Sequence, residues 1–274
     1  MSAERTFAVP PDAAWLSGRT GRGVRVVVVD SGVNPWHPHV RAVAGGVDVR
    51  ADGTLGEDWI DRLGHGTAVC AAIKQHAPDA ELWVARVFED RLATRIDVLV
   101  RALEWAMAQE PHLVNLSLGT ATAAHRSAFE PVLTRASAQG TLVVSADVHD
   151  GREWLPGTLP QAVGVRVAPA LPQGSVCLHT LADGGVRAEA VGLPRPIPGV
   201  PAALNLHGIS FAVATTTGAL ARVLEGTGRP SGFAGLRQAF RPASLEAPAR
   251  TEGLAARSGR ESPSGAPHPC DGSP

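Results

Sequence analysis

The sequence predicts an α/β fold in which a mostly parallel sheet is flanked by helices on both faces. Three observations indicate this fold. Apolar, β-branched runs recur along the chain, stretches with a helical spacing of apolar residues lie between them, and turn-forming residues separate the two. With 274 residues, 44% of them hydrophobic and 19% charged, the chain can bury a sizeable core.

The first half of the chain predicts two strands and a helix. A run of valines over residues 24–29 ends at a polar turn, as is typical of a strand buried on both faces of a parallel sheet. A second strand is expected over residues 82–88. A helix is expected between Thr94, a candidate N-cap, and Pro111, because apolar residues there recur every three or four positions, at Ile96, Leu99, Leu103 and Ala106.

The second half continues the same alternation. A helix is predicted over residues 128–139, followed by Gly140 at its end, and a last helix over residues 211–224, opened by Ser210. Strands are expected over residues 113–118, 142–146 and 162–167. Strands separated by helices favour parallel pairing, so one sheet should contain all of them.

Composition sets the domain boundaries and excludes several functions. Residues 1–240 are expected to form one domain. Residues 241–274, rich in Pro, Ala, Ser and Gly, have almost no large apolar residues and are predicted to be a disordered tail. A net charge of −1 argues against a nucleic-acid partner or an anionic membrane surface, and the longest apolar runs are too short to span a membrane.

Cysteine usage and the first residues bear on compartment and cofactors. Three scattered cysteines are too few for a disulfide framework or a zinc site, and no acidic cluster resembles a calcium loop, so no metal or cofactor is expected. The first five residues lack the basic and apolar regions of a signal peptide, and we therefore expect a cytoplasmic protein.

Three segments each supply one group needed for acyl transfer by a serine. The reaction needs a hydroxyl nucleophile, an imidazole that takes its proton and a carboxylate that orients the imidazole. Asp30 follows a predicted strand, His65 lies in Gly64-His65-Gly66-Thr67, and Ser210 precedes a predicted helix. Each alone has a plain alternative, namely a turn former, a structural turn or an N-cap. Their combination in this order indicates a catalytic triad.

The motifs around these residues resemble those of the subtilisin-like serine peptidases, the subtilase family. They are Val28-Val29-Asp30-Ser31-Gly32-Val33, Gly64-His65-Gly66-Thr67 and Gly208-Ile209-Ser210-Phe211-Ala212. The chain order Asp, His, Ser is also that of subtilisin. The resemblance covers about residues 10–225 and implies a subtilisin-like three-layer fold and a triad of Asp30, His65 and Ser210.

The resemblance also implies where a peptide substrate binds. The substrate would add as a strand beside Ser117, Leu118 and Gly119, with a facing wall formed by Ala146, Asp147 and Val148. Val148 would narrow the P1 pocket. Asp147 either favours a basic P1 residue or is a surface carboxylate. Ile96, Leu99 and Leu118 either line an apolar P4 site or belong to the core.

One position departs from the family in a way that concerns catalysis. Subtilases place an Asn side chain in the oxyanion hole, and the matching position here is His149. None of the three asparagines in the chain, Asn34, Asn115 and Asn205, is available for that role. Either His149 donates a ring N–H to the oxyanion or the site has lost this donor and works more slowly, with His149 a solvated loop residue.

The sequence therefore predicts a serine endopeptidase that works through an acyl-enzyme. A cytoplasmic location would favour restricted processing of a peptide or protein precursor. The alternative is a weak or inactive homologue that binds peptides, and peptide ligation or cyclisation is a third interpretation. A separate folding or regulatory partner is also considered, because subtilases usually carry a prodomain that is not recognisable here.

Overall fold

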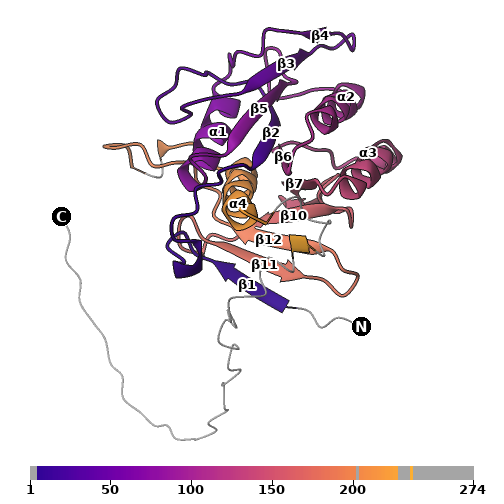
Figure 1. Ribbon diagram of the computed structural model, residues 1–274. Coiled ribbons are helices and arrows are strands. Elements are labelled where there is room, and N and C mark those ends of the chain that lie inside the picture. The colour runs from indigo at the N-terminus through magenta and orange to yellow at the C-terminus, as the bar shows by residue number, and fades with distance from the viewer. Residues whose placement is uncertain (1–4, 202–203, 228–234, 237–274) are drawn as a thin grey trace, which may run out of the picture.

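The structure, a computed structural model, describes residues 5–201, 204–227 and 235–236. A ten-stranded sheet forms its centre, with the strand order β1-β11-β12-β10-β7-β6-β2-β5-β3-β4 (Figure 1). From β12 through β3 in this order the neighbouring strands pair in parallel, and the antiparallel pairs lie toward the two edges. The expected mostly parallel α/β fold is confirmed.

The strands of the large sheet are β1 (Arg5–Val9), β2 (Arg25–Asp30), β3 (Gly45–Val49), β4 (Leu55–Gly56), β5 (Glu81–Arg86), β6 (Leu113–Leu116), β7 (Leu142–Ala146), β10 (Ala162–Val167), β11 (Val176–Thr180) and β12 (Val186–Ala190). A separate hairpin contains β8 (Val148–His149) and β9 (Arg152–Glu153). Asp150 and Gly151 at its turn both have positive φ, as a two-residue hairpin with an Asp-Gly turn requires.

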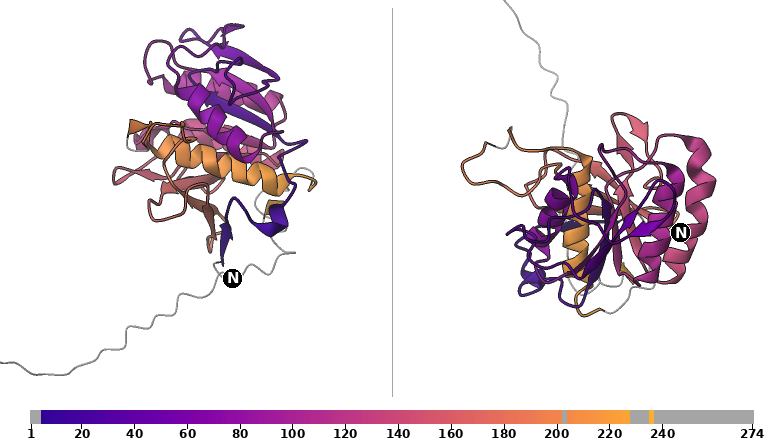
Figure 2. Two further views of the ribbon diagram at one scale, coloured as in Figure 1. Left: turned by 90° about the vertical axis from the view of Figure 1, so that its left-hand side faces the viewer. Right: turned by 90° about the horizontal axis from the view of Figure 1, so that it is seen from above.

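Helices cover both faces of the sheet. Helices α1 (His65–His76) and α4 (Ile209–Leu224) pack on one face, and α2 (Ile96–Ala108) and α3 (Arg126–Ala138) on the other (Figures 1 and 2). Successive residues of a strand point to opposite faces, which explains why β2 is apolar throughout. Its alternate valines divide between two cores, one holding Val26 and Val28 and the other Val27 and Val29.

The order in which successive strands join the sheet reverses at β2. After β2 it forms β3 and β5 on one side, and then crosses to form β6, β7 and β10 on the other. In an open parallel sheet, the carboxyl ends of the strands at such a switch point leave a crevice between diverging connections. Asp30 ends β2 and Ser117 directly follows β6, so both lie at this crevice.

Several element boundaries differ from the expectations. The helix that begins at His65 was not predicted, because its small and polar residues give a weak apolar period. Helix α4 begins at Ile209, so Ser210 lies inside its first turn and is not the N-cap. Strand β6 ends at Leu116, which leaves Ser117 and Leu118 beyond it. The expected glycine after the third helix is confirmed, since Gly140 has a φ of 74°.

Two further expectations concern the ends of the chain and membranes. The predicted tail, residues 241–274, lies outside the described residues. In the part of the chain that the structure describes, none of the helices combines the length and apolar character needed to span a bilayer.

Candidate active site

Asp30 and His65 are joined by a short hydrogen bond. The side chain of Asp30 is fully buried at the end of β2, and its Oδ1 lies 2.7 Å from Nδ1 of His65. The backbone N–H of Ser31 donates to the same oxygen at 2.7 Å. A carboxylate in this place accepts the Nδ1 proton, which leaves Nε2 of His65 as the nitrogen able to accept another proton.

The surroundings of His65 raise the pKa of its imidazole. Burial opposes the charged form, but the hydrogen bond to Asp30 and the negative charges of Asp30 and Asp61 outweigh it, and the net effect is a raised pKa. An imidazole with this environment is a stronger proton acceptor than one free in water. The site therefore favours a histidine that gains a proton during a reaction.

Ser210 shares a cavity with His65 but does not bond to it in the described structure. Its hydroxyl donates to the backbone oxygen of Ser117 at 3.2 Å, and the hydroxyl of Ser117 is 3.4 Å from the backbone oxygen of Ser210. The next residue, Phe211, places its ring centroid 5.9 Å from that of His65. A change of the Ser210 side-chain rotamer is the movement needed to turn its hydroxyl toward the imidazole.

A buried polar network fixes the helix that carries Ser210 against the end of β6. Asn115 donates from Nδ2 to the hydroxyl of Ser117 at 2.8 Å, and its Oδ1 accepts from the hydroxyl of Thr217 at 2.9 Å. Because Asn115 and Thr217 are both fully buried, losing either partner would leave an unsatisfied polar group. Asn115 is thus a buried residue that supports this part of the site without lining the cavity.

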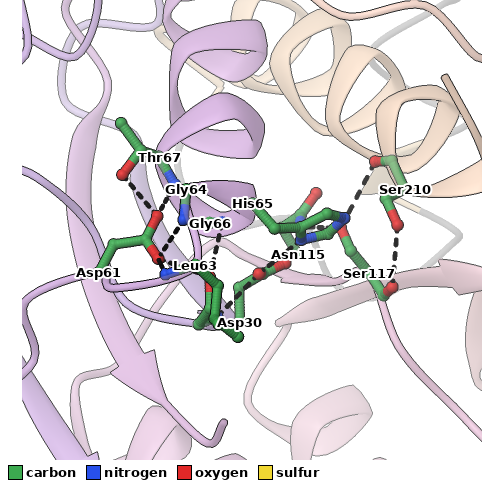
Figure 3. A network of polar contacts seen from close by, with 11 residues as sticks. Asp30, Asp61, Leu63, Gly64, His65, Gly66, Thr67, Asn115, Ser117 and Ser210 are labelled. Atoms are coloured by element: carbon green, nitrogen blue, oxygen red, sulfur yellow. Dashed lines mark hydrogen bonds and ion pairs between the residues drawn. The ribbon is translucent and has the colours of Figure 1, made fainter. Parts of the chain in front are cut away.

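Asp61 is a functional residue that the sequence analysis missed. Its Oδ1 accepts hydrogen bonds from Ser31 Oγ and the backbone N–H groups of Leu63 and Gly64, and its Oδ2 accepts from the N–H and hydroxyl of Thr67 (Figure 3). These bonds satisfy free donors at the start of α1, where His65 is the first residue. An Asp shortly before a helix was the available signal.

A cavity of about 430 Å³ lies in front of these groups. It contains both His65 and Ser210, together with Ser117, Leu118, Gly119 and Ala146 of the residues expected to bind substrate. The apolar residues considered for a P4 site, Ile96, Leu99 and Leu118, also line it. No described carboxylate lines the cavity.

His149 lines the same cavity at the end of β8. Its side chain is partly exposed, its Nε2 lies 3.5 Å from a carboxylate oxygen of Asp150, and its ring centroid lies 6.2 Å from that of Trp154. Its neighbours Val148 and Asp150 are not among the lining residues. The hairpin thus brings His149, and neither neighbour, to the cavity that holds Ser210.

The expectations for Asp147 and Val148 need correction. Asp147 is fully buried and pairs with Arg166, 2.7 Å away, and with Arg187. Its carboxylate is therefore neither on the surface nor available to a basic P1 side chain. The reason is the alternation along the strand end, which directs residue 147 away from the cavity that Ala146 lines. Val148 is half-buried and also lies outside the cavity lining.

Among the described residues, no group of three or more His, Cys, Asp or Glu side chains is placed to hold a metal ion. Cys70 is buried in α1, and burial raises the pKa of its thiol strongly, so it remains a neutral core residue.

The chain is similar to known proteins in sequence and in fold. The sequence profile of the subtilase family matches residues 21–150. Subtilisin E of Bacillus subtilis (strain 168) is 25% identical over 226 residues, which cover 78% of this chain and 58% of that protein. The solved structure of sphericase superposes with a TM-score of 0.62 at 23% identity, covering 80% of this chain and 82% of the other.

Two longer relatives match about half of the chain. The minor extracellular protease Epr of Bacillus subtilis (strain 168) is 29% identical over 147 residues, and the Homo sapiens membrane-bound transcription factor site-1 protease is 33% identical over 146 residues. These matches cover only 22% and 13% of the relatives' own lengths. The family profile and the related sequences show that this chain is similar to subtilases, and the solved structure shows that it shares their fold.

Proposed function

We propose that the protein is a serine endopeptidase with Ser210 as nucleophile, His65 as general base and Asp30 as the orienting acid. The observation that carries this proposal is the 2.7 Å bond between Asp30 and Nδ1 of His65, which leaves Nε2 free to serve the cavity that Ser210 shares. The match of residues 21–150 to the subtilase family profile supports the same activity.

The reaction follows from these positions. Ser210 Oγ attacks the peptide carbonyl carbon while its proton passes to Nε2 of His65, and the imidazolium is stabilised by the carboxylate of Asp30. When the C–N bond breaks, Nε2 returns the proton to the leaving amine, and an acyl-enzyme remains on Ser210. Water then attacks the ester in the same manner, with His65 again as base.

The oxyanion needs donors that face the cavity. The backbone N–H of Ser210 lies in the first turn of α4, where helix N–H groups have no intrahelical partner and the helix dipole is positive. We propose His149 as the second donor, because it lines the cavity at the end of a hairpin beside Ser210. A neutral imidazole has one N–H to donate and a protonated one has two.

Labelling with a fluorophosphonate tests the nucleophile without knowledge of the substrate. We expect covalent labelling of the wild-type chain at Ser210, identified by peptide mass spectrometry, and its loss in Ser210→Ala. Ser137→Ala, which changes an exposed serine of α3, is the matched control and should label like the wild type. An unlabelled wild-type protein that still binds peptides would replace the proposal with a peptide-binding role.

We further propose that the substrate is a peptide or protein precursor that is cut at few places. This rests on the expected cytoplasmic location, where unrestricted digestion would harm the cell. Identification of new N-termini in a proteome digest tests it: few cleavage sites with a shared pattern support restricted processing, and cleavage throughout unfolded proteins contradicts it.

A further inference from the structure

The cavity that holds Ser210 is lined by a tryptophan, Trp154, that the catalytic proposal does not use. If Ser210 is the nucleophile, the resemblance to subtilases implies that the P1 side chain enters between the substrate-pairing segment at residues 117–119 and the end of β7 at Ala146. Both of these segments line the cavity, and so does Trp154. The inference therefore rests on the proposed function and concerns the class of substrate.

Trp154 lies beside Gly119 of one wall and near His149. Cε3 of the indole lies 3.5 Å from the point that a Cβ on Gly119 would occupy, so the ring lies beside this glycine. On its other side the ring centroid lies 6.2 Å from that of His149. The indole is half-buried and packs against the hydrophobic core. The ring thus borders the cavity that a P1 side chain would enter.

Hydrogen bonds hold the indole in this position. Its Nε1 donates to the backbone oxygen of His149 at 3.3 Å, and its backbone N–H donates to that of Asp147 at 2.8 Å. The next residue, Leu155, exchanges two backbone hydrogen bonds with Thr120, at 2.8 and 3.0 Å. The segment with Trp154 is thus tied both to the end of the substrate-pairing segment and to the hairpin of His149.

The carboxylate of Asp147 anchors the same segment to the sheet. It is buried between Arg166 of β10 and Arg187 of β12, so the chain on either side of it cannot move without exposing or breaking this ion pair. An indole tied at both its ring nitrogen and its backbone does not swing aside at low cost, and the pocket stays narrow when substrate binds.

We propose that Trp154 fills the P1 pocket and restricts cleavage to peptide bonds that follow glycine, alanine or serine. A larger side chain would have to displace the indole and break its bond to His149, whereas a hydrogen, methyl or hydroxymethyl group fits against its face. Affinity then comes from residues farther toward the substrate N-terminus, where Leu92, Ile96 and Leu99 offer apolar surface.

Peptides that differ only at P1 test the proposal directly. In a series with leucine fixed at P4 and Gly, Ala, Ser, Leu or Phe at P1, we expect kcat/KM for the small residues to exceed that for Phe by about 100-fold. In Trp154→Ala, kcat/KM for Phe should rise at least about 10-fold relative to Ala. Trp36→Ala removes an exposed tryptophan away from the cavity and should leave the profile unchanged.

A binding experiment separates this inference from the peptidase proposal. Calorimetry of Ser210→Ala with the same peptides reports the P1 preference without catalysis, and circular dichroism checks that each Trp154 variant folds. Tighter binding of small-P1 peptides supports the pocket assignment even if fluorophosphonate labelling fails. The inference is overturned if the wild type cleaves Phe or Leu peptides preferentially, or if Ser210→Ala binds them more tightly than small-P1 peptides. An unchanged P1 preference in folded Trp154→Ala also overturns it.

Discussion

At the scale of single residues, His65 depends on two carboxylates that act on it in different ways. Asp30 binds the imidazole itself, whereas Asp61 binds the backbone and side chains of the turn that presents it. Both negative charges raise the pKa of His65. Asp61 is therefore a positioning residue with an electrostatic effect that a purely structural residue would lack.

Asp61→Asn should lower kcat/KM by about 10- to 100-fold, because the amide cannot accept all the hydrogen bonds that fix the His65 turn. Loss of the charge also lowers the pKa of His65, so the acidic limb of the kcat/KM profile should move to lower pH. A pH series measures both effects. Asp52→Asn, in an exposed turn, is the control. If kcat/KM falls but the acidic limb of its pH profile stays at the same pH, Asp61 has a structural role alone.

His149 gives a second prediction at this scale. If its ring N–H stabilises the oxyanion, His149→Ala should lower kcat by roughly 100-fold and change KM much less, since the interaction forms only in the transition state. His149→Asn should retain or raise kcat, because an amide donates from the same position. Steady-state kinetics test this prediction. If His149→Ala has the kcat of the wild type, His149 does not stabilise the oxyanion, and the Ser210 N–H is the donor that remains assigned.

At the scale of elements, the contact between α1 and α4 sets the separation of His65 from Ser210, since each helix carries one of them in its first turn. Figure 2 shows the two helices lying together on one face of the sheet. Gly218 lies at their contact. A Cβ there would be 2.8 Å from Cβ of His76 and 2.9 Å from the backbone oxygen of Ile73.

Gly218→Ala should therefore lower the free energy of unfolding by about 1–3 kcal/mol, although alanine has the higher helix propensity. Overpacking at this contact pushes the helices apart and should also lower kcat. Urea unfolding and peptide hydrolysis measure the two effects. Ser137→Ala, on the exposed face of α3, should change neither. A more stable Gly218→Ala protein would show that the contact between α1 and α4 accommodates the added methyl group without strain.

At the scale of the whole molecule, stability should depend on pH through His76. This histidine packs between Gly174 and Gly218, and burial together with the charge of Arg222 lowers its pKa to about 4. In the unfolded chain His76 takes up a proton below about pH 6.5, whereas the folded protein does so only near pH 4. The folded state therefore loses stability as the pH falls through this window.

The loss should approach about 3 kcal/mol at pH 4, at 1.36 kcal/mol for each pH unit. His65 has a raised pKa and works in the opposite direction, so the comparison must be with His76→Gln, which keeps His65. Urea unfolding at pH 7.5, 6 and 5 should show a shallower pH dependence in the variant. Equal slopes in both proteins would remove His76 as a source of acid instability.

The sequence by itself determined the parallel centre of the sheet (β2, β5, β6, β7 and β10), the helices α2, α3 and α4, and the motifs around the three proposed catalytic residues. A run of valines is buried on both faces wherever it lies, and a glycine with positive φ ends a helix by local geometry, as Gly140 does. The order Asp, His, Ser is also a property of the chain alone. These features depend on neighbours in sequence, which is why pattern and spacing reveal them.

Tertiary structure decided which side chains reach the cavity. Asp147 is followed two positions later by His149, yet Asp147 points to two arginines from distant strands and His149 to the site. Alternation along one strand would place both on the same face, so the difference arises because the chain leaves β7 after Ala146 and enters the separate hairpin at Val148. Trp154 lines the same cavity and lies beside Gly119, thirty-five positions earlier in the chain. Such contacts depend on how strands and loops pack, because no local period records which distant backbone a side chain meets.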